Sequence, residues 1–340
     1  MKSVVIDEPG KVRLNEIAEP ELKSDEVLLE IQYIGLCGTD LSTYRGLSPF
    51  VTYPIIPGHE VSGIIVSMGT KVPSTLKIGD KVTVNPYTSC GVCPACRLGR
   101  MNTCEFNQTL GVQRDGALRQ YFAIPYNKIL KSNKLSSQEF SLVEPLSVGY
   151  HATNRGQVTE IDTVLVIGCG MIGIGAIVAS LKKGAAVIAI DLDDRKLELV
   201  KSFGVKLTIN ANEPDLLKQV KEITSGEGAS VCIEAVGSAS TYVLAVDAAT
   251  FAGRVVYIGY AKKEIQFNTS LFVKKELSIL GSRNALFEFR PVIQMLEEKK
   301  MPFEKLISKI YPLKETPAAL ERWNKTPGDF IKILIDVKGL

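Results

Sequence analysis

The possible metal ligands of the sequence are most closely spaced in SCGVCPACRLGRMNTC, residues 89–104. Three cysteines follow at C-x₂-C-x₂-C spacing and a fourth comes eight residues later: Cys90, Cys93, Cys96 and Cys104. Four thiolates on a short loop can close a tetrahedral shell of sulfur, which suits Zn²⁺ or an iron–sulfur cluster. Such a shell leaves no open position. We therefore expect this loop to hold its metal for structure and not for catalysis.

A second set of possible ligands lies upstream of this loop. GLCGTD places Cys37 before Thr39 and Asp40, and PGHE places His59 beside Glu60. One cysteine, one histidine and a carboxylate would supply three protein ligands and leave a fourth position for water or an alcohol, as in catalytic zinc sites. A lone cysteine is also common in protein cores. The residues alone leave both interpretations open.

The stretch from 164 to 196 carries a glycine pattern. An apolar strand at 164–167 runs into G-x-G-x-x-G, an apparent helix follows, and a second apolar strand ends at Asp191. This is the context that a dinucleotide-binding fingerprint requires. We expect the helix N-terminus to hold the pyrophosphate and Asp191 to bind the adenosine ribose, which favours NAD over NADP. The positions of the fingerprint are Gly168, Gly170, Met171, Ile172 and Gly173.

The apolar pattern predicts an α/β fold with two domains. From 148 to 284, six apolar runs alternate with helical stretches, which predicts a doubly wound parallel sheet. Short apolar segments cut by Gly and Pro predict a compact antiparallel barrel over 1–147. The run DFIKILIDV near the end looks like a strand that returns to the barrel, so 285–340 belong with the first domain.

Composition favours small-molecule partners. The chain has 340 residues, 45% of them hydrophobic, and a net charge of +3 from 40 basic and 37 acidic residues. Since no run of five or six like charges occurs, we expect no nucleic acid or anionic lipid as partner. No signal peptide and no eighteen-residue apolar run is visible, so we expect a cytoplasmic chain without a membrane span. An odd total of seven cysteines fits full disulfide pairing poorly.

In chain order, the cysteine of GLCGTD, the GHE, the four-cysteine loop, the EP of VEPLSVGYHA and the glycine fingerprint resemble the zinc-dependent medium-chain dehydrogenases over essentially the whole chain. The resemblance implies a GroES-like β-barrel catalytic domain with a zinc-binding lobe, and a Rossmann domain for NAD. It also implies one catalytic and one structural zinc per subunit, and a homo-oligomer, either tetramer or dimer. In this family the third protein ligand is Cys in the vertebrate alcohol dehydrogenases and Glu in the sorbitol and threonine dehydrogenases. Glu144 therefore implies the second branch.

The resemblance also implies roles for single residues. Cys37, His59 and Glu144 match the ligands of the catalytic zinc. Glu60 matches a neighbouring glutamate that is a ligand in some states. Thr39 matches the hydroxyl that contacts the substrate oxygen and begins the proton relay. The four cysteines of the loop match the structural zinc site.

Other positions either depart from the family pattern or are expected to serve only in packing. Ser42 stands where several relatives have a relay histidine, so we expect the proton to leave through water or a cofactor ribose hydroxyl. We expect His151 to be a packing residue in the helix that joins the domains. Cys169 and Cys232 have no nearby ligand-spaced partner, so we expect them to be small buried hydrophobes.

Substrate choice is the least determined. The loop TYRGLSPFVTYPIIPG offers Tyr44, Arg45, Phe50 and Tyr53 as substrate contacts or, equally, as surface and packing residues. This loop and GSRNA at 281–285 resemble members that oxidise sugar acids such as L-galactonate, L-gulonate or L-idonate. We therefore expect hydride transfer between NAD and a secondary alcohol of a polyol or sugar acid. The alternatives are an L-threonine 3-dehydrogenase, a sorbitol or butanediol dehydrogenase, and a non-enzymatic structural or nucleic-acid-binding zinc protein.

Overall fold

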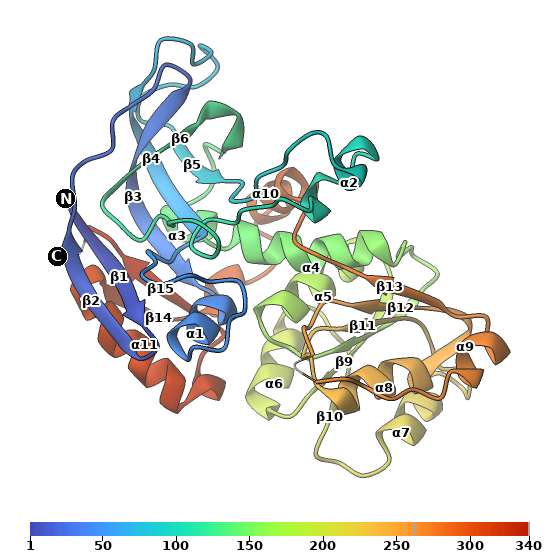
Figure 1. Cartoon of the computed structure of the whole chain (residues 1–340). Coiled ribbons are helices and arrows are strands. Elements are labelled where there is room, and N and C mark those ends of the chain that lie inside the picture. The colour runs from blue at the N-terminus through green and yellow to red at the C-terminus, as the bar shows by residue number, and fades with distance from the viewer. Residues whose placement is uncertain (262, 339–340) are drawn as a thin grey trace. The chain divides into compact units, whose positions relative to one another are not determined.

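The computed structural model describes residues 1–261 and 263–338. It divides into two compact units (Figure 1). The first unit comprises Met1–Glu144 and Phe289–Leu340, and the second comprises Pro145–Glu288. The predicted boundaries, after 147 and after 284, lie within four residues of these.

Six parallel strands form the sheet of the second unit. They are β8 Thr163–Ile167, β9 Ala186–Asp191, β10 Leu207–Asn210, β11 Ala229–Glu234, β12 Ala249–Tyr257 and β13 Ser278–Gly281. Their order is β10-β9-β8-β11-β12-β13, with every neighbouring pair parallel. Residues 164–167 are almost completely buried, since a central parallel strand is covered on both faces. The apolar run that predicts β8 reflects this burial.

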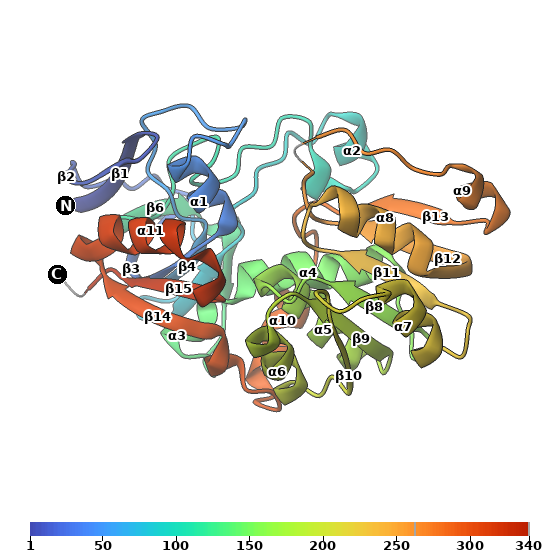
Figure 2. The same cartoon turned by 90° about the horizontal axis from the view of Figure 1, so that it is seen from below.

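Helices connect these strands: α5 Met171–Lys182, α6 Asp194–Ser202, α7 Leu216–Ile223, α8 Ala239–Ala248 and α9 Ser270–Lys274. The chain moves outward from β8 to β10, and then in the opposite direction from β11 to β13. Because such crossovers are right-handed, α5 and α6 pack on one face of the sheet and α8 on the other. The elements can be followed in the second view (Figure 2). The carboxyl ends of β8 and β11 meet where the order reverses, which is where such sheets bind ligands.

The first unit has a hairpin, β1 Lys2–Glu8 with β2 Lys11–Glu16, and a seven-stranded sheet. The sheet runs β14-β15-β3-β4-β5-β7, and β6 also pairs with β3. Its strands are β3 Glu26–Leu36, β4 Glu60–Met68, β5 Lys81–Val84, β6 Tyr121–Pro125, β7 Ile129–Lys131, β14 Ile307–Pro312 and β15 Lys332–Asp336. The last strand, β15, pairs antiparallel with β3, with Ile333 opposite Leu36.

One pair departs from the predicted antiparallel pattern. β14 and β15 are parallel. Helix α11, Thr316–Lys325, lies between them in the chain. A parallel pair needs a crossover connection, and the helix supplies it. The sheet is therefore mixed, and the sequence analysis did not identify α11 as a crossover.

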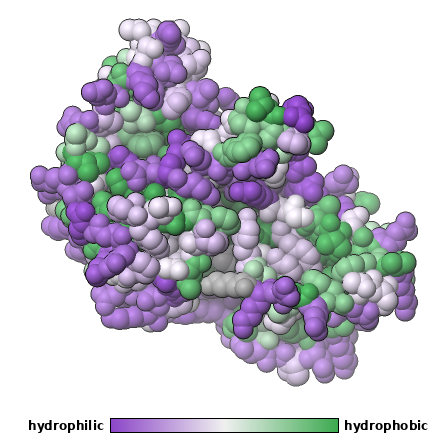
Figure 3. All heavy atoms as spheres, viewed as in Figure 1, coloured by the Kyte–Doolittle hydropathy of each residue, from purple (hydrophilic) through white to green (hydrophobic). Residues whose placement is uncertain are grey.

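Each unit has its own hydrophobic core. In the first unit, Leu29, Ile31 and Ile34 of β3 belong to a cluster that reaches Ile333 and Ile335 of β15. In the second unit, the cluster forms around residues of β8 and β9. Hydrophilic side chains predominate on the face shown in Figure 3, with hydrophobic ones gathered in patches. Within the described ranges, no helix has both the length and the apolar character needed to cross a bilayer.

Candidate functional site

The loop from Cys90 to Cys104, here called the cysteine lobe, gathers its four sulfurs in one place. These sulfurs lie within 4.8 Å of one another. The Sγ atoms of Cys90 and Cys96 are 4.0 Å apart, and those of Cys93 and Cys104 are 3.9 Å apart. Four sulfurs at 2.3 Å from one tetrahedral ion would be about 3.8 Å apart. The lobe therefore fits a closed zinc site.

Local structure explains why the cysteine lobe adopts this shape. Helix α2, Pro94–Arg97, begins at a proline, with Cys93 at its N-cap. The N–H of Cys93 donates to Cys90 Sγ at 3.3 Å, and the N–H of Cys90 donates to Cys104 Sγ at 3.4 Å. Backbone N–H groups of Glu105 and Cys96 lower the pKa of the Cys93 thiol to about 6. Donors of this kind favour the thiolate form that binds metal.

A second group of donor atoms, here called the mixed group, comprises Cys37, His59 and Glu60. One atom of each lies within 4.8 Å of the others. Cys37 follows β3 and caps helix α1, Gly38–Tyr44, while His59 directly precedes β4. Because β3 and β4 pair with Gly35 opposite Glu60, the end of one strand meets the start of the other. This register brings together residues that are far apart in sequence.

The mixed group fits a metal ion by its chemistry. His59 is buried, and its Nδ1 has no hydrogen-bond partner among the described residues. A histidine nitrogen, a cysteine sulfur and a carboxylate oxygen within 4.8 Å of one another form a donor set that zinc accepts. Thr39 stands next to the group in the first turn of α1. Its Oγ1 is 3.7 Å from Cys37 Sγ, and its N–H donates to the same sulfur at 3.5 Å.

Charges around His59 oppose the effect of its burial. Burial disfavours the charged imidazole, but the negative charges of Cys37 and Asp40 outweigh it and hold the pKa of His59 well above its usual value. Asp40 is itself fully buried, which raises the pKa of its carboxyl group although His59 acts in the opposite direction. Its Oδ2 accepts the N–H of Cys37 at 2.8 Å. Asp40 thus fixes the backbone of one member of the mixed group and acts electrostatically on another.

Glu60 is held by a lysine that comes from the last strand. Lys332 Nζ donates to Glu60 Oε1 at 2.6 Å and Oε2 at 2.5 Å, and to the carbonyl of Leu36 at 3.0 Å. Both side chains are buried. A Cβ at position 35 would lie 2.0 Å from Glu60 Oε2, so Gly35 leaves the space that this carboxylate occupies. The ion pair compensates the charge of Glu60 inside the first unit.

Glu144 lies near the mixed group but is not one of its three members. It stands in the first turn of helix α4, Val143–Arg155, and is buried. The hydroxyl of Tyr87 donates to Glu144 Oε1. Burial raises the pKa of Glu144, while the nearby His59 opposes that shift. Burial and then the charge of Glu144 raise the pKa of Tyr87 well above its usual value, so the phenol keeps the proton that it donates.

In the second unit, the glycine fingerprint forms a turn between β8 and α5. Gly168 has a φ of 98°, a conformation that favours glycine. A Cβ at Gly170, the N-cap of α5, would meet nothing within 4 Å, so the backbone is open to a ligand there. A Cβ at Gly173 would lie 1.8 Å from the carbonyl oxygen of Gly168. The turn therefore needs small residues and leaves open the N-terminus of a twelve-residue helix.

A cavity of about 1030 Å³ lies at this turn. Gly168, Gly170 and Asp191 line it, whereas Met171, Ile172 and Gly173 are not among its lining residues. The Asp191 carboxylate is fixed at the end of β9. Its Oδ2 accepts the N–H of Cys169 at 2.7 Å, and its Oδ1 accepts the N–H of Asp193 at 3.0 Å. Lys196 lines the same cavity and supplies a positive charge.

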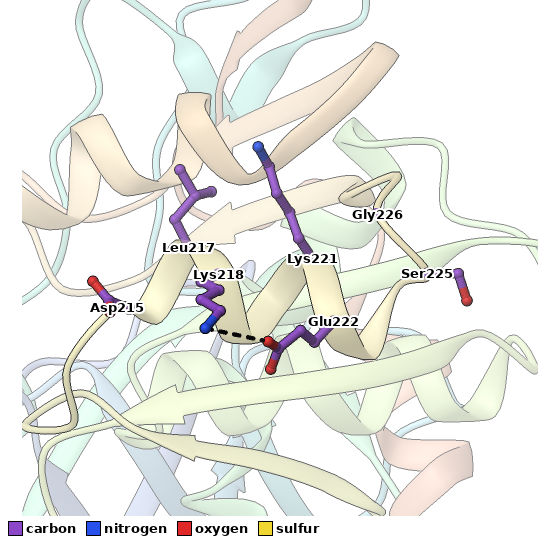
Figure 4. A pocket seen from close by; sticks show the side chains of 7 residues that line it. All are labelled: Asp215, Leu217, Lys218, Lys221, Glu222, Ser225 and Gly226. Carbon is purple, nitrogen blue, oxygen red and sulfur yellow. Dashed lines mark ion pairs between the residues drawn. The ribbon is translucent and has the colours of Figure 1, made fainter.

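A second cavity in this unit is a surface feature of α7. It measures about 660 Å³, and its side chains are shown in Figure 4. Lys218 and Glu222 form an ion pair at 3.8 Å across one helical turn, and both are largely exposed. Such a pair is typical of a solvated helix face. This cavity contributes nothing to the fingerprint or to the metal groups.

The loop after Cys37 gives little support to a substrate-binding role. Arg45 is engaged by α11, since its Nε donates to Asn324 Oδ1 at 2.6 Å. Tyr53 donates its hydroxyl to the carbonyl of Thr43 at 2.5 Å. Tyr44 packs against the core of the first unit. The contacts of these side chains favour the packing interpretation.

His151 does more than pack. It is buried, as expected, but its Nδ1 lies 3.0 Å from Glu288 Oε1. Although burial opposes it, the hydrogen bond and the charge of His151 lower the pKa of Glu288 to about 2. Cys169 and Cys232 are buried, as the sequence predicts.

Four side chains at these sites escaped the sequence analysis or had no role there: Tyr87, Lys332, Asp40 and Lys196. Lys332 carries a weak signal, because it is the one basic residue in the largely apolar strand β15. Lys196 comes five residues after Asp191 and lies in the first turn of α6. Tyr87 precedes Cys90 by three residues, and nothing in that spacing indicates its contact with Glu144.

Comparison with known proteins identifies two family models along the chain. Residues 23–134 match the alcohol dehydrogenase GroES-like domain, and residues 172–298 match the zinc-binding dehydrogenase model. The first match contains the cysteine lobe and the mixed group. The second begins inside the glycine fingerprint.

Similar proteins extend over almost the whole chain. An uncharacterized zinc-type alcohol dehydrogenase-like protein of Haemophilus influenzae is 34% identical over 334 residues, 98% of each chain. The L-galactonate-5-dehydrogenase of Escherichia coli K12 is 32% identical over 323 residues, 95% of each chain. A structure described as a short chain alcohol dehydrogenase from E. coli CFT073, complexed with NADH, is 31% identical with a TM-score of 0.92 and covers 99% of each chain.

Proposed function

The chain belongs to the zinc-binding dehydrogenases with an alcohol dehydrogenase GroES-like domain, and we propose that it transfers hydride between a secondary alcohol of a polyol or sugar acid and NAD. One observation carries the proposal. A sulfur, an imidazole nitrogen and a carboxylate oxygen from separate strand ends converge within 4.8 Å. An all-sulfur site, by contrast, is present elsewhere in the same unit for structure.

Cys37, His59 and Glu144 are the ligands of the catalytic zinc in this proposal. The convergence of one atom each from Cys37 and His59 within 4.8 Å supports the first two, and the effect of the nearby His59 on the pKa of Glu144 supports the third. Glu60 lies in the mixed group, but Lys332 donates to both of its oxygens. We therefore take Glu60 as the neighbouring carboxylate. Cys90, Cys93, Cys96 and Cys104 hold the structural zinc.

A zinc ion held by Cys37, His59 and Glu144 would supply a Lewis acid that lowers the pKa of a hydroxyl bound to it. The chain's own residues position the alcohol and receive its proton. Thr39 Oγ1, in the first turn of α1, lies 3.7 Å from Cys37 Sγ and begins the relay. Ser42 replaces the relay histidine of several relatives, so water or a cofactor ribose hydroxyl completes it.

In this proposal, NAD binds to the second unit and accepts the hydride. The N-terminus of α5, with Gly170 open to the cavity, suits the pyrophosphate. Asp191, fixed by two backbone N–H groups, faces the cavity with a negative charge that repels a 2′-phosphate. Lys196 lines the same cavity and suits a ribose hydroxyl. NAD is therefore preferred over NADP.

Sugar acids of the L-galactonate, L-gulonate or L-idonate type are our leading substrate class. Support comes from the likeness to the L-galactonate-5-dehydrogenase. L-threonine, sorbitol and butanediol are the alternatives.

The direct experiment measures NADH formation on a panel of polyols, aldonates, threonine and butanediol. We expect an aldonate or polyol to give the highest kcat/KM, and activity to disappear after chelation and return with Zn²⁺. A highest rate with threonine would overturn the substrate class. Full activity after removal of all zinc would overturn the mechanism.

We also propose that the chain forms a homo-oligomer, either a tetramer or a dimer. β13 is the last strand of its sheet and, among the described residues, pairs only with β12. An unpaired strand edge invites pairing with another chain. Phe251, Val273 and Ile279 of the adjacent elements are exposed and apolar. Light scattering should give at least a dimer for the wild type, and a monomeric wild type would contradict this.

A further inference from the structure

Tyr87 is a buried phenol whose hydroxyl meets a catalytic carboxylate. We propose that Tyr87 is a positioning residue that sets the orientation of Glu144 for zinc binding and links this carboxylate to the cysteine lobe. The inference rests on the proposed function, because Glu144 is a zinc ligand only there. It assigns to Tyr87 a role in metal binding without any contact with the metal.

The contact between the two side chains is secluded from water. Tyr87 and Glu144 are each 5% exposed, and the phenol hydroxyl donates to Glu144 Oε1. A hydrogen bond to an ionised carboxylate is about twice as strong as one between neutral groups. Holding one oxygen of a carboxylate also fixes the direction of the other. The phenol thus limits the orientations in which Glu144 can face the mixed group.

Tyr87 itself is held on several sides. Its ring meets the edge of Phe289, with the ring centroids 6.3 Å apart and an interplanar angle of 68°. Lys128 Nζ donates to the carbonyl of Tyr87 at 2.7 Å. The N–H of Tyr87 donates to Asn85 Oδ1 at 3.0 Å. Because the ring and the backbone are both anchored, Glu144 adapts to the phenol and not the reverse.

The segment that carries Tyr87 continues into the cysteine lobe. The next residue, Thr88, receives the N–H of Gln108 on its Oγ1 at 2.6 Å and donates its own N–H to Asn107 Oδ1 at 3.1 Å. These partners lie just beyond Cys104, while Cys90 follows Thr88 by two residues. The two ends of the lobe are therefore joined at the base of Tyr87. A zinc ion that closes the lobe also supports the residue that orients Glu144.

Removing the hydroxyl alone tests this role. Tyr87→Phe keeps the ring against Phe289 and leaves Glu144 without this donor. Loss of an outer partner of a metal ligand costs about 10- to 100-fold in metal affinity or activity. We expect the weaker-bound of the two zinc ions to bind about tenfold less tightly in competition with a chromophoric chelator. The visible absorption bands of the cobalt-substituted catalytic site should shift, while the cysteine lobe keeps its affinity.

Tyr311→Phe is the matched control. Tyr311 is a buried tyrosine of the same unit whose hydroxyl has no hydrogen-bond partner among the described residues. Its loss should change neither zinc affinity nor the cobalt spectrum. Lys128→Met is a second test variant, since it removes a backbone anchor of Tyr87 and keeps the hydroxyl. It should shift the cobalt spectrum in the same direction as Tyr87→Phe, but less.

Glu144→Gln separates this inference from the proposed function. If Glu144→Gln weakens the catalytic zinc while Tyr87→Phe and Lys128→Met match the wild type, the inference is overturned and the proposed function stands. If Glu144→Gln leaves zinc affinity and rate unchanged, the ligand assignment itself fails. In the double variant, Tyr87→Phe should add little to Glu144→Gln, because both act through one interaction. Fully additive effects would contradict the inference.

Discussion

The two metal-ligand groups of the first unit are built in opposite ways. The cysteine lobe draws four sulfurs from one short loop, and its backbone N–H groups point at those sulfurs. The mixed group draws Cys37 from the end of β3 and His59 from the start of β4, with Glu144 nearby on α4. The lobe needs only its own turns. The mixed group needs the strand register and a helix.

From this difference we expect the cysteine lobe to serve the stability of the fold and the mixed group to serve the reaction. An all-sulfur shell is complete and has no position for a substrate. The mixed group has fewer donor atoms, and polar side chains hold the carboxylates in and beside it: Lys332 holds Glu60, and Tyr87 holds the neighbouring Glu144. Substitutions in the lobe should therefore act mainly on stability, and substitutions in the mixed group mainly on rate.

The largest effect is expected for His59→Ala. It removes the proposed nitrogen ligand of the catalytic zinc, so kcat should fall more than about a thousandfold, which several kcal/mol of lost charge stabilisation imply. Zinc content, measured by elemental analysis, should fall from two ions per subunit to one. His151→Asn, at the only other histidine of the sequence, should keep both ions. A His59→Ala variant that keeps both ions and its rate would contradict the claim that the mixed group holds the catalytic zinc.

Cys96→Ser, in the cysteine lobe, should lower the stability of the fold more than the rate. It opens the closed shell of the cysteine lobe, so the free energy of unfolding should fall by more than about 4 kcal/mol, a loss typical of removing a structural metal. Denaturant unfolding measures this. The rate per folded, zinc-loaded molecule should drop far less than in His59→Ala. An unchanged unfolding free energy would show that the lobe does not stabilise the fold.

Lys332→Met tests whether the buried ion pair with Glu60, a member of the mixed group, stabilises the fold. It leaves the buried carboxylate of Glu60 without its ion-pair partner, which should cost about 3 kcal/mol of unfolding free energy. Denaturant titration checks the value. Combining it with Glu60→Gln should restore most of the stability, because no buried charge remains unpaired. If the single variant is as stable as the wild type, the ion pair does not stabilise the fold.

The smallest effect is expected for a residue that lies outside the cysteine lobe and the mixed group. Asp191→Asn removes the charge that faces the cofactor cavity, so the preference for NAD over NADP should fall about tenfold, the factor that 1.4 kcal/mol represents. Ratios of kcat/KM with the two cofactors measure it. Zinc content should stay at two ions per subunit. An unchanged preference would mean that Asp191 does not select the cofactor.

The local features were readable from the sequence, and the long-range ones were not. The cysteine lobe and the turn at Gly168 depend on residues close together in the chain, so their spacing shows them. The parallel pairing of β14 with β15 depends on α11 as a crossover, which periodicity does not reveal. Lys332 reaches Glu60 only because β15 pairs with β3.

Side-chain partners were the least predictable part of the candidate site. Arg45 could serve a substrate as far as its sequence shows, but Asn324 from α11 engages it. His151 has the burial expected of a packing residue, yet it faces Glu288 at the far end of the second unit's sequence. Such contacts follow from tertiary packing, and a single sequence carries no record of them.

The most direct test of the account counts zinc and activity together. During graded chelation of the purified protein, we predict that NADH formation falls in proportion to the first ion lost, while the fold survives until the second ion leaves. Full turnover with one ion or fewer per subunit would contradict the central claim that one zinc serves chemistry and the other serves structure.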